Sequence, residues 1–136
     1  MVDVGVGQLR GSRTRLAARG EEADKAGDPA TAGLLFFYAA ECALKAELLT
    51  ERQARTTAAL PSNLRSHNLR ALAKELNLSR RAASALVACR PRRRGHQPID
   101  AQDLHQAWRY GAELDAADQQ GAISALRDLI AACEKR

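Results

Sequence analysis

The pattern of apolar and polar positions is clearest between Leu34 and Leu49, where the chain reads LLFFYAAECALKAELL. Positions spaced four, three, four and three apart share one stripe of a helix: Leu35, Ala39, Cys42, Ala46 and Leu49. Small residues on this stripe allow a second helix to approach closely. The stretch is too short and too charged to span a membrane. It therefore predicts the central helix of a soluble bundle.

The preceding segment carries a weaker helical pattern. Residues 8–26 are helical by composition, although Gly11 and Gly20 disfavour a continuous helix. The sequence Gly27-Asp28-Pro29 indicates a stop and a restart, because Asp28 can cap a helix and Pro29 suits its first position. The central helix is expected to run from about residue 29 to residue 55.

A third helix is expected to open near His67, after a connection over residues 56–66. Its apolar positions recur at i, i+3, i+4 and i+7: Leu69, Leu72, Ala73 and Leu76. Asn77 suits its end, and Ser79 can cap a further helix through about Cys89. The stretch 90–95, which reads RPRRRG, predicts a loop.

The C-terminal part predicts two more helices. Asp100 and Asp103 resemble a capping arrangement for a short helix to about Tyr110, and a last helix is expected over residues 119–134. The chain shows no internal repeat and no low-complexity linker. Residues 1–136 are thus interpreted as one all-α domain, an up-and-down bundle of about five to six helices.

Composition agrees with a helical fold, because apolar residues make up 46% of the chain and aromatic residues only 4%. The three cysteines lie far apart without a CxxC pair, which argues against a disulfide framework or a zinc knuckle. The start, MVDVGVGQLRGS, has no signal-peptide pattern. A cytoplasmic location is therefore expected, and neither a metal nor a cofactor is predicted.

The positive charge is concentrated in one segment. Residues 65–94 contain nine basic residues and the single acid Glu75, a net charge of +8. Because the whole chain carries +5, the remainder must carry −3. A segment of this kind favours an anionic partner over a generally basic surface.

Three short motifs resemble those of HEPN domains, which are small helical bundles of prokaryotes and higher eukaryotes. Their second helix often reads A-x-E-x-A-L-K-A-x-L, and the matching residues here are Ala39, Glu41, Ala43, Leu44, Lys45, Ala46 and Leu48. The stretch 67–72, HNLRAL, is similar to the family's H-D-L-x-x-L, and 108–110, WRY, is similar to its A-R-Y segment. The order and spacing of the motifs agree over roughly residues 15–134.

This resemblance implies a subunit of a bacterial toxin–antitoxin or antiphage defence module, with RNA or another phosphate-bearing ligand as partner. Sibling family members work beside a small nucleotidyltransferase, so a protein partner of that type is implied too. We expect the subunit to act in binding or assembly. A homodimer through apolar helix faces is also expected.

Many HEPN proteins are metal-independent ribonucleases, and this activity is the first alternative. They carry R-x(4–6)-H, usually on both subunits of a dimer, in which Arg neutralises the scissile phosphate and His transfers protons. Here no His follows Arg109 at that spacing, and the formal match is Arg90 with His96 in the predicted loop. These two residues are the catalytic candidates if the protein cleaves RNA.

Other polar residues each have a structural and a functional interpretation. Glu41 and Lys45 form either a surface pair or a polar groove at a nucleotide or RNA site. His67 and His105 are structural residues or ligands, although their spacing matches no metal template. The WRY stretch suits either packing or stacking on a base through Arg109.

The second alternative is a helix-turn-helix regulator of DNA over residues 72–87. Residues 72–76 would form its first helix, 77–79 the turn and 80–87 the recognition helix. In this interpretation Arg80 and Arg81 face a major groove. The candidate nucleic-acid contacts, whichever polymer is bound, are Arg80, Arg81, Arg92, Arg93, Arg94 and Arg109.

Overall fold

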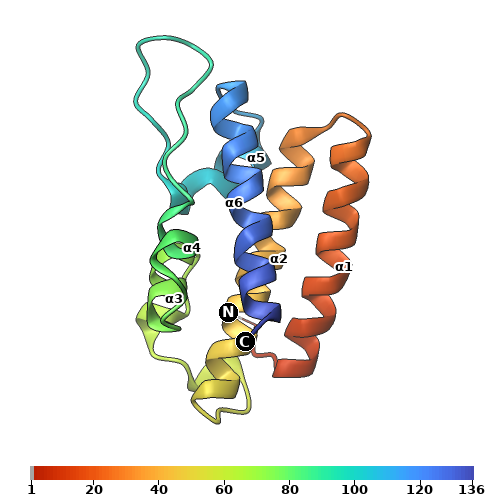
Figure 1. Cartoon of the computed structure of the whole chain (residues 1–136), viewed down its shortest axis with the longest axis vertical. Coiled ribbons are helices and arrows are strands. Elements are labelled where there is room, and N and C mark those ends of the chain that lie inside the picture. The colour runs from red at the N-terminus through yellow and green to blue at the C-terminus, as the bar shows by residue number, and fades with distance from the viewer. Residues whose placement is uncertain (1) are drawn as a thin grey trace.

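The computed structural model describes residues 2–136, and this part of the chain contains six α-helices. They are α1 (Val6–Lys25), α2 (Pro29–Glu51), α3 (Leu69–Glu75), α4 (Arg80–Ser84), α5 (Leu104–Tyr110) and α6 (Ala116–Glu134). Three short 3₁₀ turns accompany them: η1 (Thr57–Ala59), η2 (Ser62–Leu64) and η3 (Ala101–Asp103). The predicted all-α helical bundle is confirmed (Figure 1).

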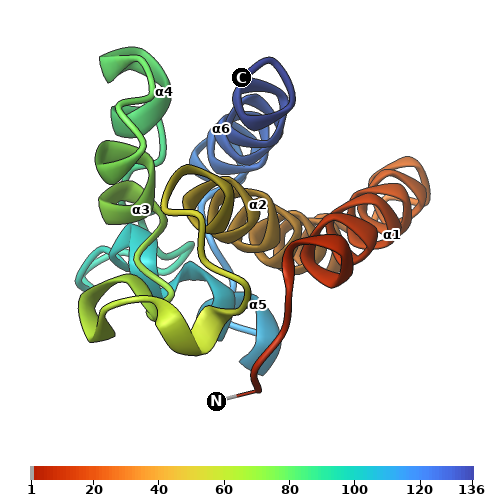
Figure 2. The same ribbon diagram turned by 90° about the horizontal axis from the view of Figure 1, so that it is seen from below.

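Helix α2 lies at the centre of the bundle. Seen end-on it lies between α1 and α3, and it also packs against α5 and α6 (Figure 2). Its N-terminus forms as predicted, because Pro29 opens the helix and the Asp28 carboxylate accepts a hydrogen bond from Thr31 N–H at 3.2 Å. The helix buries residues on every face, including Phe36, Phe37, Leu44 and Leu48. Of the predicted stripe, Ala39, Ala46 and Leu49 are buried, whereas Leu35 and Cys42 are only partly buried.

Helices α1, α3, α5 and α6 each pack against α2, whereas α4 packs against α3 and α6. Helix α6 buries Ile123, Leu126, Leu129 and Ile130, and α3 buries Leu69 and Leu72. None of the helices within residues 2–136 is both long and apolar enough for a bilayer crossing.

Helix α1 is continuous in spite of its glycines, and Gly20 explains part of its packing. A Cβ at Gly20 would lie 3.0 Å from the Phe36 ring, so the glycine allows α1 and α2 to approach closely. The guanidinium of Arg127 lies 4.7 Å from the centre of the same ring. It also binds Glu21 and Asp24 of α1 at 2.8 and 2.6 Å. Charged contacts thus tie α1 to α6 over an aromatic ring.

Two predicted helices are shorter than expected. Helix α2 ends at Glu51, four residues before the expected end, and Gln53 follows with φ of 53°. Helix α4 ends at Ser84 instead of continuing to about Cys89. Its continuation is prevented because the backbone of Cys89 pairs with that of Ile99, with N–O distances of 2.9 and 2.8 Å. Pro91 also disfavours a helical conformation at Arg90, the residue before it.

The turns between the short helices follow the prediction in part. Asn77 ends α3 in the left-handed region, with φ of 55°, and Ser79 caps α4 through Ala82 N–H at 3.2 Å. The expected capping role of Asp100 and Asp103 was wrong, because neither side chain accepts a capping hydrogen bond. A 3₁₀ turn, η3, instead leads directly into α5.

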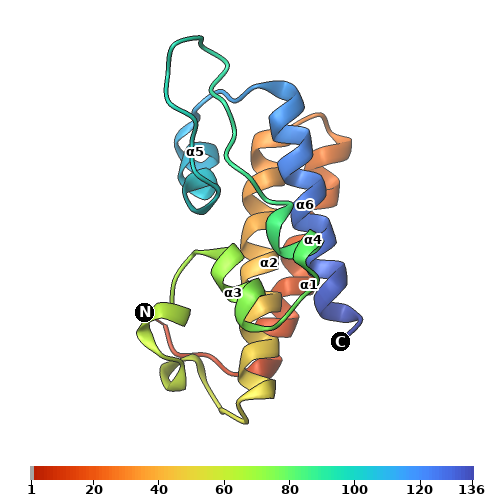
Figure 3. The ribbon, with the colours of Figure 1, turned by 60° about the vertical axis from the view of Figure 1, so that its left-hand side comes forward.

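Residues 90–98 form a loop that includes the predicted stretch 90–95 and projects from one end of the bundle (Figures 1 and 3). Two backbone bridges lie at its base, between Cys89 and Ile99 and between Pro91 and Leu114. The Arg-rich part of the basic segment therefore stands away from α3 and α4.

Gly33 is the glycine whose substitution should cost most stability. A Cβ there would lie 2.5–2.8 Å from atoms of the Trp108 indole ring. We expect Gly33→Ala to reduce the free energy of unfolding by about 1–3 kcal/mol through overpacking. Gly121→Ala in α6 is the control, because nothing lies within 4 Å of its Cβ position. That change should be neutral or stabilise by up to about 1 kcal/mol. Urea denaturation measures both, and equal effects would contradict the packing argument.

Candidate functional site

A polar cluster joins α2 to the segment just before α3. Glu41 and Lys45 lie one turn apart on α2, and their side chains form an ion pair of 2.9 Å. The other carboxylate oxygen of Glu41 lies 2.7 Å from Nδ1 of His67. The Lys45 and Glu41 side chains are only 8% and 14% exposed, whereas that of His67 is 54% exposed. The Glu41–Lys45 pair is therefore largely buried, and His67 carries the cluster to the surface.

His105 of α5 extends the cluster inward. Its ring centre lies 4.7 Å from that of His67 and 4.8 Å from that of Phe37, and the residue is 4% exposed. Burial, followed by the charge of His67, lowers the pKa of His105, although Glu41 and the Gln102 carbonyl act in the opposite direction. Its Nδ1 atom nevertheless has no partner with hydrogen-bond geometry. The surroundings of His105 therefore disfavour its protonated form.

The contact with Glu41 determines which ring nitrogen of His67 carries the hydrogen. An ionised carboxylate only accepts hydrogen bonds, so Nδ1 of His67 must carry the hydrogen. In the neutral imidazole, Nε2 is then left with a free lone pair. A ring held in this way can accept a hydrogen bond, transfer a proton or stack against a flat ligand.

One turn after His105, Arg109 lies between two tyrosines. Its guanidinium carbon is 5.8 Å from the ring centres of both Tyr38 and Tyr110, and it donates a hydrogen bond to the Tyr38 hydroxyl. Tyr110 is 76% exposed. The adjacent Trp108 is buried, and its indole N–H donates to Gln119 at 2.9 Å. Within this stretch, Trp108 packs while Arg109 and Tyr110 remain at the surface.

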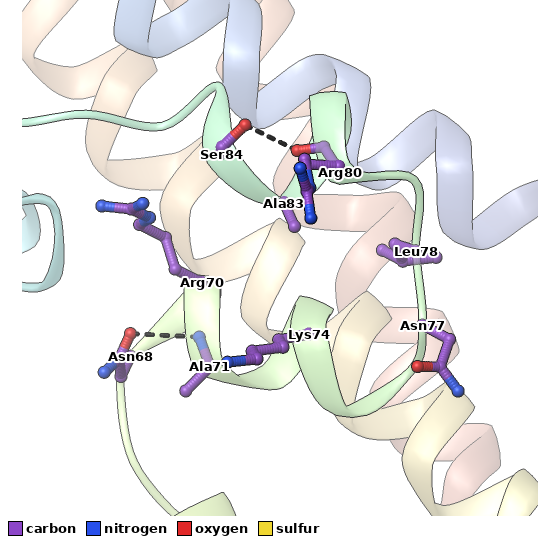
Figure 4. A pocket seen from close by; sticks show the side chains of 9 residues that line it. All are labelled: Asn68, Arg70, Ala71, Lys74, Asn77, Leu78, Arg80, Ala83 and Ser84. Carbon is purple, nitrogen blue, oxygen red and sulfur yellow. Dashed lines mark hydrogen bonds between the residues drawn. The ribbon is translucent and has the colours of Figure 1, made fainter.

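A second feature is an open groove between α3 and α4, which we call the basic groove (Figure 4). Its volume is about 640 Å³. The side chains of Arg70 and Lys74 come from α3 and that of Arg80 comes from α4. The remaining lining residues are Asn68, Ala71, Asn77, Leu78, Ala83 and Ser84.

The charged side chains that line the basic groove are all positive. No carboxylate lines it, and Arg70, Lys74 and Arg80 form no ion pair with any residue in the described range 2–136. The next residue after Lys74 is the acid Glu75, which binds Arg52 at 2.8 Å. Three cationic side chains are therefore free to bind an anion.

The basic groove and the polar cluster are connected through Asn68. This residue lines the groove and also a cavity of about 360 Å³ beside His67 and His105. It lines a third hollow as well, together with Arg70, Asp100 and Gln102. A ligand can thus reach from the cations of α3 to the exposed face of His67.

Arg90 and His96, the candidate catalytic pair, have different surroundings. Arg90 donates to both carboxylate oxygens of Asp118, at 2.9 and 3.1 Å, and lies 3.5 Å from Asp115. The guanidinium of Arg90 lowers the pKa of Asp118 to about 2. His96 lines a separate hollow under the projecting loop, with Arg93. Among the contacts of residues 2–136 there is none between Arg90 and His96.

The other basic candidates are divided between two places. Arg80 lines the groove, whereas Arg81, next to it on α4, does not. Arg92 lies 3.6 Å from Glu113, and Arg93 and Arg94 follow it in the exposed loop. Arg109 belongs to the tyrosine contact on α5. The structure thus does not gather these six arginines into one surface.

Sequence reasoning missed Arg70 and Lys74 as site residues, although a signal was present. They lie four positions apart, off the apolar stripe formed by Leu69, Leu72 and Leu76. That spacing places both on one solvent face of α3. The contact between the His67 and His105 rings had no such signal, because it joins residues that are 38 positions apart and belong to different elements.

Comparison with models of protein families, with curated proteins and with solved structures found no match. Within residues 2–136, no three His, Cys, Asp or Glu side chains are grouped so that they could hold a metal ion. Burial raises the pKa of the free thiols of Cys89 and Cys133, to about 11 and about 12, which disfavours their use as nucleophiles. The polar cluster and the basic groove are therefore the candidate site.

The Glu41–Lys45 pair should be required for stability. Glu41→Gln leaves the Lys45 ammonium nearly buried without its counter-charge, so we expect the free energy of unfolding to fall by about 2–4 kcal/mol. Adding Lys45→Met should recover part of this loss. The control is Glu22→Gln, which breaks an ion pair whose side chains are 67% and 66% exposed. Urea denaturation of the four proteins should show a control effect within about 0.5 kcal/mol. An equally small loss in Glu41→Gln would contradict the argument.

Protonation of His105 should make stability depend on pH. Its pKa is lowered in the folded state, so the unfolded chain binds more protons as the pH falls through the ordinary histidine value of 6.5. The free energy of unfolding should therefore decrease between pH 7 and pH 5. His105→Phe should flatten this slope, as measured by urea denaturation at several pH values. His96→Gln, in the exposed loop, is the control and should retain the slope.

Proposed function

We propose that this protein binds RNA and contacts its phosphates through the basic groove between α3 and α4. The observation that carries the proposal is the set of three unpaired cations, Arg70, Lys74 and Arg80, around a groove without a carboxylate. A row of phosphates neutralises such cations and releases condensed counterions, which favours binding. The protein acts as a binding subunit in this proposal.

The distribution of ion pairs supports the groove as the phosphate contact. Within the basic segment, Arg90 and Arg92 have acidic partners, Asp118 and Glu113. Phosphate contacts by these two residues would have to compete with carboxylates already in place. The cations of the groove have no such competitor, so their full charge is available to a ligand.

The resemblance to HEPN domains is compatible with this function. Glu41 and Lys45 come from one of the resembling motifs and His67 from another, and the three side chains meet in one cluster beside the groove. A place in a toxin–antitoxin or antiphage module, a nucleotidyltransferase-type partner and a homodimer stay predictions. Large apolar side chains exposed within residues 2–136 are Val2, Val87 and Tyr110.

Binding is favoured over the two alternative functions. A ribonuclease that uses Arg90 and His96 would need Arg90 to leave Asp118, which it contacts through its backbone N–H as well as its side chain. A helix-turn-helix regulator would have to read DNA with α4, which is five residues long and buries no side chain of its own. Phosphate binding in the basic groove requires no ion pair to break and no helix to enter a DNA groove.

The test is RNA binding by a pair of matched double variants. Arg70→Gln/Lys74→Gln should weaken binding of single-stranded RNA at least about tenfold. The slope of log K against log salt should also become shallower, by about 0.7 for each lost phosphate contact. Arg15→Gln/Lys25→Gln removes the same charge from exposed residues of α1. Fluorescence anisotropy at several salt concentrations measures both effects.

Each possible result decides one question. Equal losses in both double variants would contradict the groove as the contact and indicate a general effect of net charge. Wild-type binding to DNA duplex that is tighter than to RNA would favour the regulator instead. Cleavage of the RNA in the presence of a chelator, abolished by His96→Ala, would favour the ribonuclease.

A further inference from the structure

The cavity beside His67 differs from the basic groove in chemistry, although Asn68 lines both. Its lining contains no lysine or arginine: Ser66, His67, Asn68, Gln102, Asp103, His105 and Gln106. We propose that this cavity holds one unpaired nucleobase of the RNA strand whose phosphates lie in the groove. The inference rests on the proposed function and adds recognition of the base to contact with the backbone.

The charges separate the two parts of the site. The groove carries three cations and no carboxylate, whereas the cavity carries Asp103 and no lysine or arginine. A phosphate is repelled by Asp103, while the amino and imino groups on a base edge donate hydrogen bonds to it. A strand that follows the groove therefore satisfies both parts by placing a phosphate at Arg70 and a base beside Asp103.

The amides of the cavity supply the remaining hydrogen bonds. Gln102 and Gln106 lie four positions apart, and neither side chain has a hydrogen-bond partner within residues 2–136. Asn68 uses its side-chain oxygen to cap α3, at 3.2 Å from Ala71 N–H, and leaves its NH₂ group free. Side-chain amides both donate and accept, as the edge of an unpaired base requires.

His67 supplies a fixed flat surface for the base. Its side chain is half exposed, and its ring is held by Glu41 on one atom and by the ring of His105 at 4.7 Å. Unpaired RNA bases stack on aromatic side chains, including histidine. Because the imidazole is oriented before binding, little of its freedom is lost when a base arrives. The cavity volume of about 360 Å³ accommodates one base.

This chemistry predicts a preference among bases. Adenine, cytosine and guanine offer Asp103 an exocyclic amino group. Uracil offers only its N3–H, which lies between two carbonyl oxygens that repel a carboxylate. Binding should therefore be weakest for oligouridine and about fivefold or more tighter when one central uridine is replaced by adenosine, cytidine or guanosine. The preference needs an unpaired base, so pairing with a complementary strand should remove it.

The experiment measures anisotropy of labelled oligouridine and of the singly substituted oligonucleotides. Asp103→Asn should abolish the preference over uridine, and His67→Ala should weaken every oligonucleotide except one with an abasic central position. His67→Phe retains a stacking ring and should retain most of the affinity. The control is Asp128→Asn, which removes an exposed carboxylate on α6 and should leave the preference unchanged.

The outcomes separate the two proposals. If no oligonucleotide binds, the proposed function fails. If all bind equally, and Asp103→Asn and His67→Ala behave as the wild type, the base pocket is overturned while the groove stands. If free adenosine monophosphate competes at the same concentration as the oligonucleotide, the cavity is a mononucleotide site and its assignment to a strand is overturned.

Discussion

The carboxylate of Glu41 is the group on which both the fold and the candidate site depend. Helix α2 is largely buried, and the Lys45 side chain within it is only 8% exposed, so this lysine is tolerated only with a counter-charge close by. Glu41 supplies that charge to Lys45 at 2.9 Å and uses its second oxygen to hold His67 at 2.7 Å. One side chain therefore stabilises the centre of the bundle and orients the ring that reaches the surface.

Helix α3 shows how a short element can serve packing and binding together. Leu69 and Leu72 are buried against the bundle, whereas Arg70 and Lys74 line the open groove on the other face. The helix has seven residues, too few to be stable in isolation. Its cations are held in position because its leucines are anchored in the core, so the binding surface depends on tertiary packing and not on the helix itself.

The sequence was sufficient for elements with strong local signals and insufficient where distant segments meet. The start of α2 at Pro29, its cap at Asp28 and the apolar stripe of α3 follow from residue type and spacing, and the structure contains all three. The end of α4 does not follow from residue type and spacing, because it depends on backbone pairing between Cys89 and Ile99. The proximity of His67 and His105 likewise comes from the packing of α3 and α5 around α2, for which local spacing gives no rule.

Net charge located the basic segment, and ion pairing together with the shape of the surface distinguishes its cations. The density of arginine is highest in the loop. Arg90, however, binds Asp118 so closely that the pKa of that carboxyl falls to about 2. This contact ties the loop to α6 through Arg90, so it is best explained as structural. Arg70, Lys74 and Arg80 are fewer and more widely spaced, and they surround a groove that contains no acid. For an anionic ligand, an unpaired cation in a shaped groove contributes more than a dense run whose first arginine is neutralised within the protein.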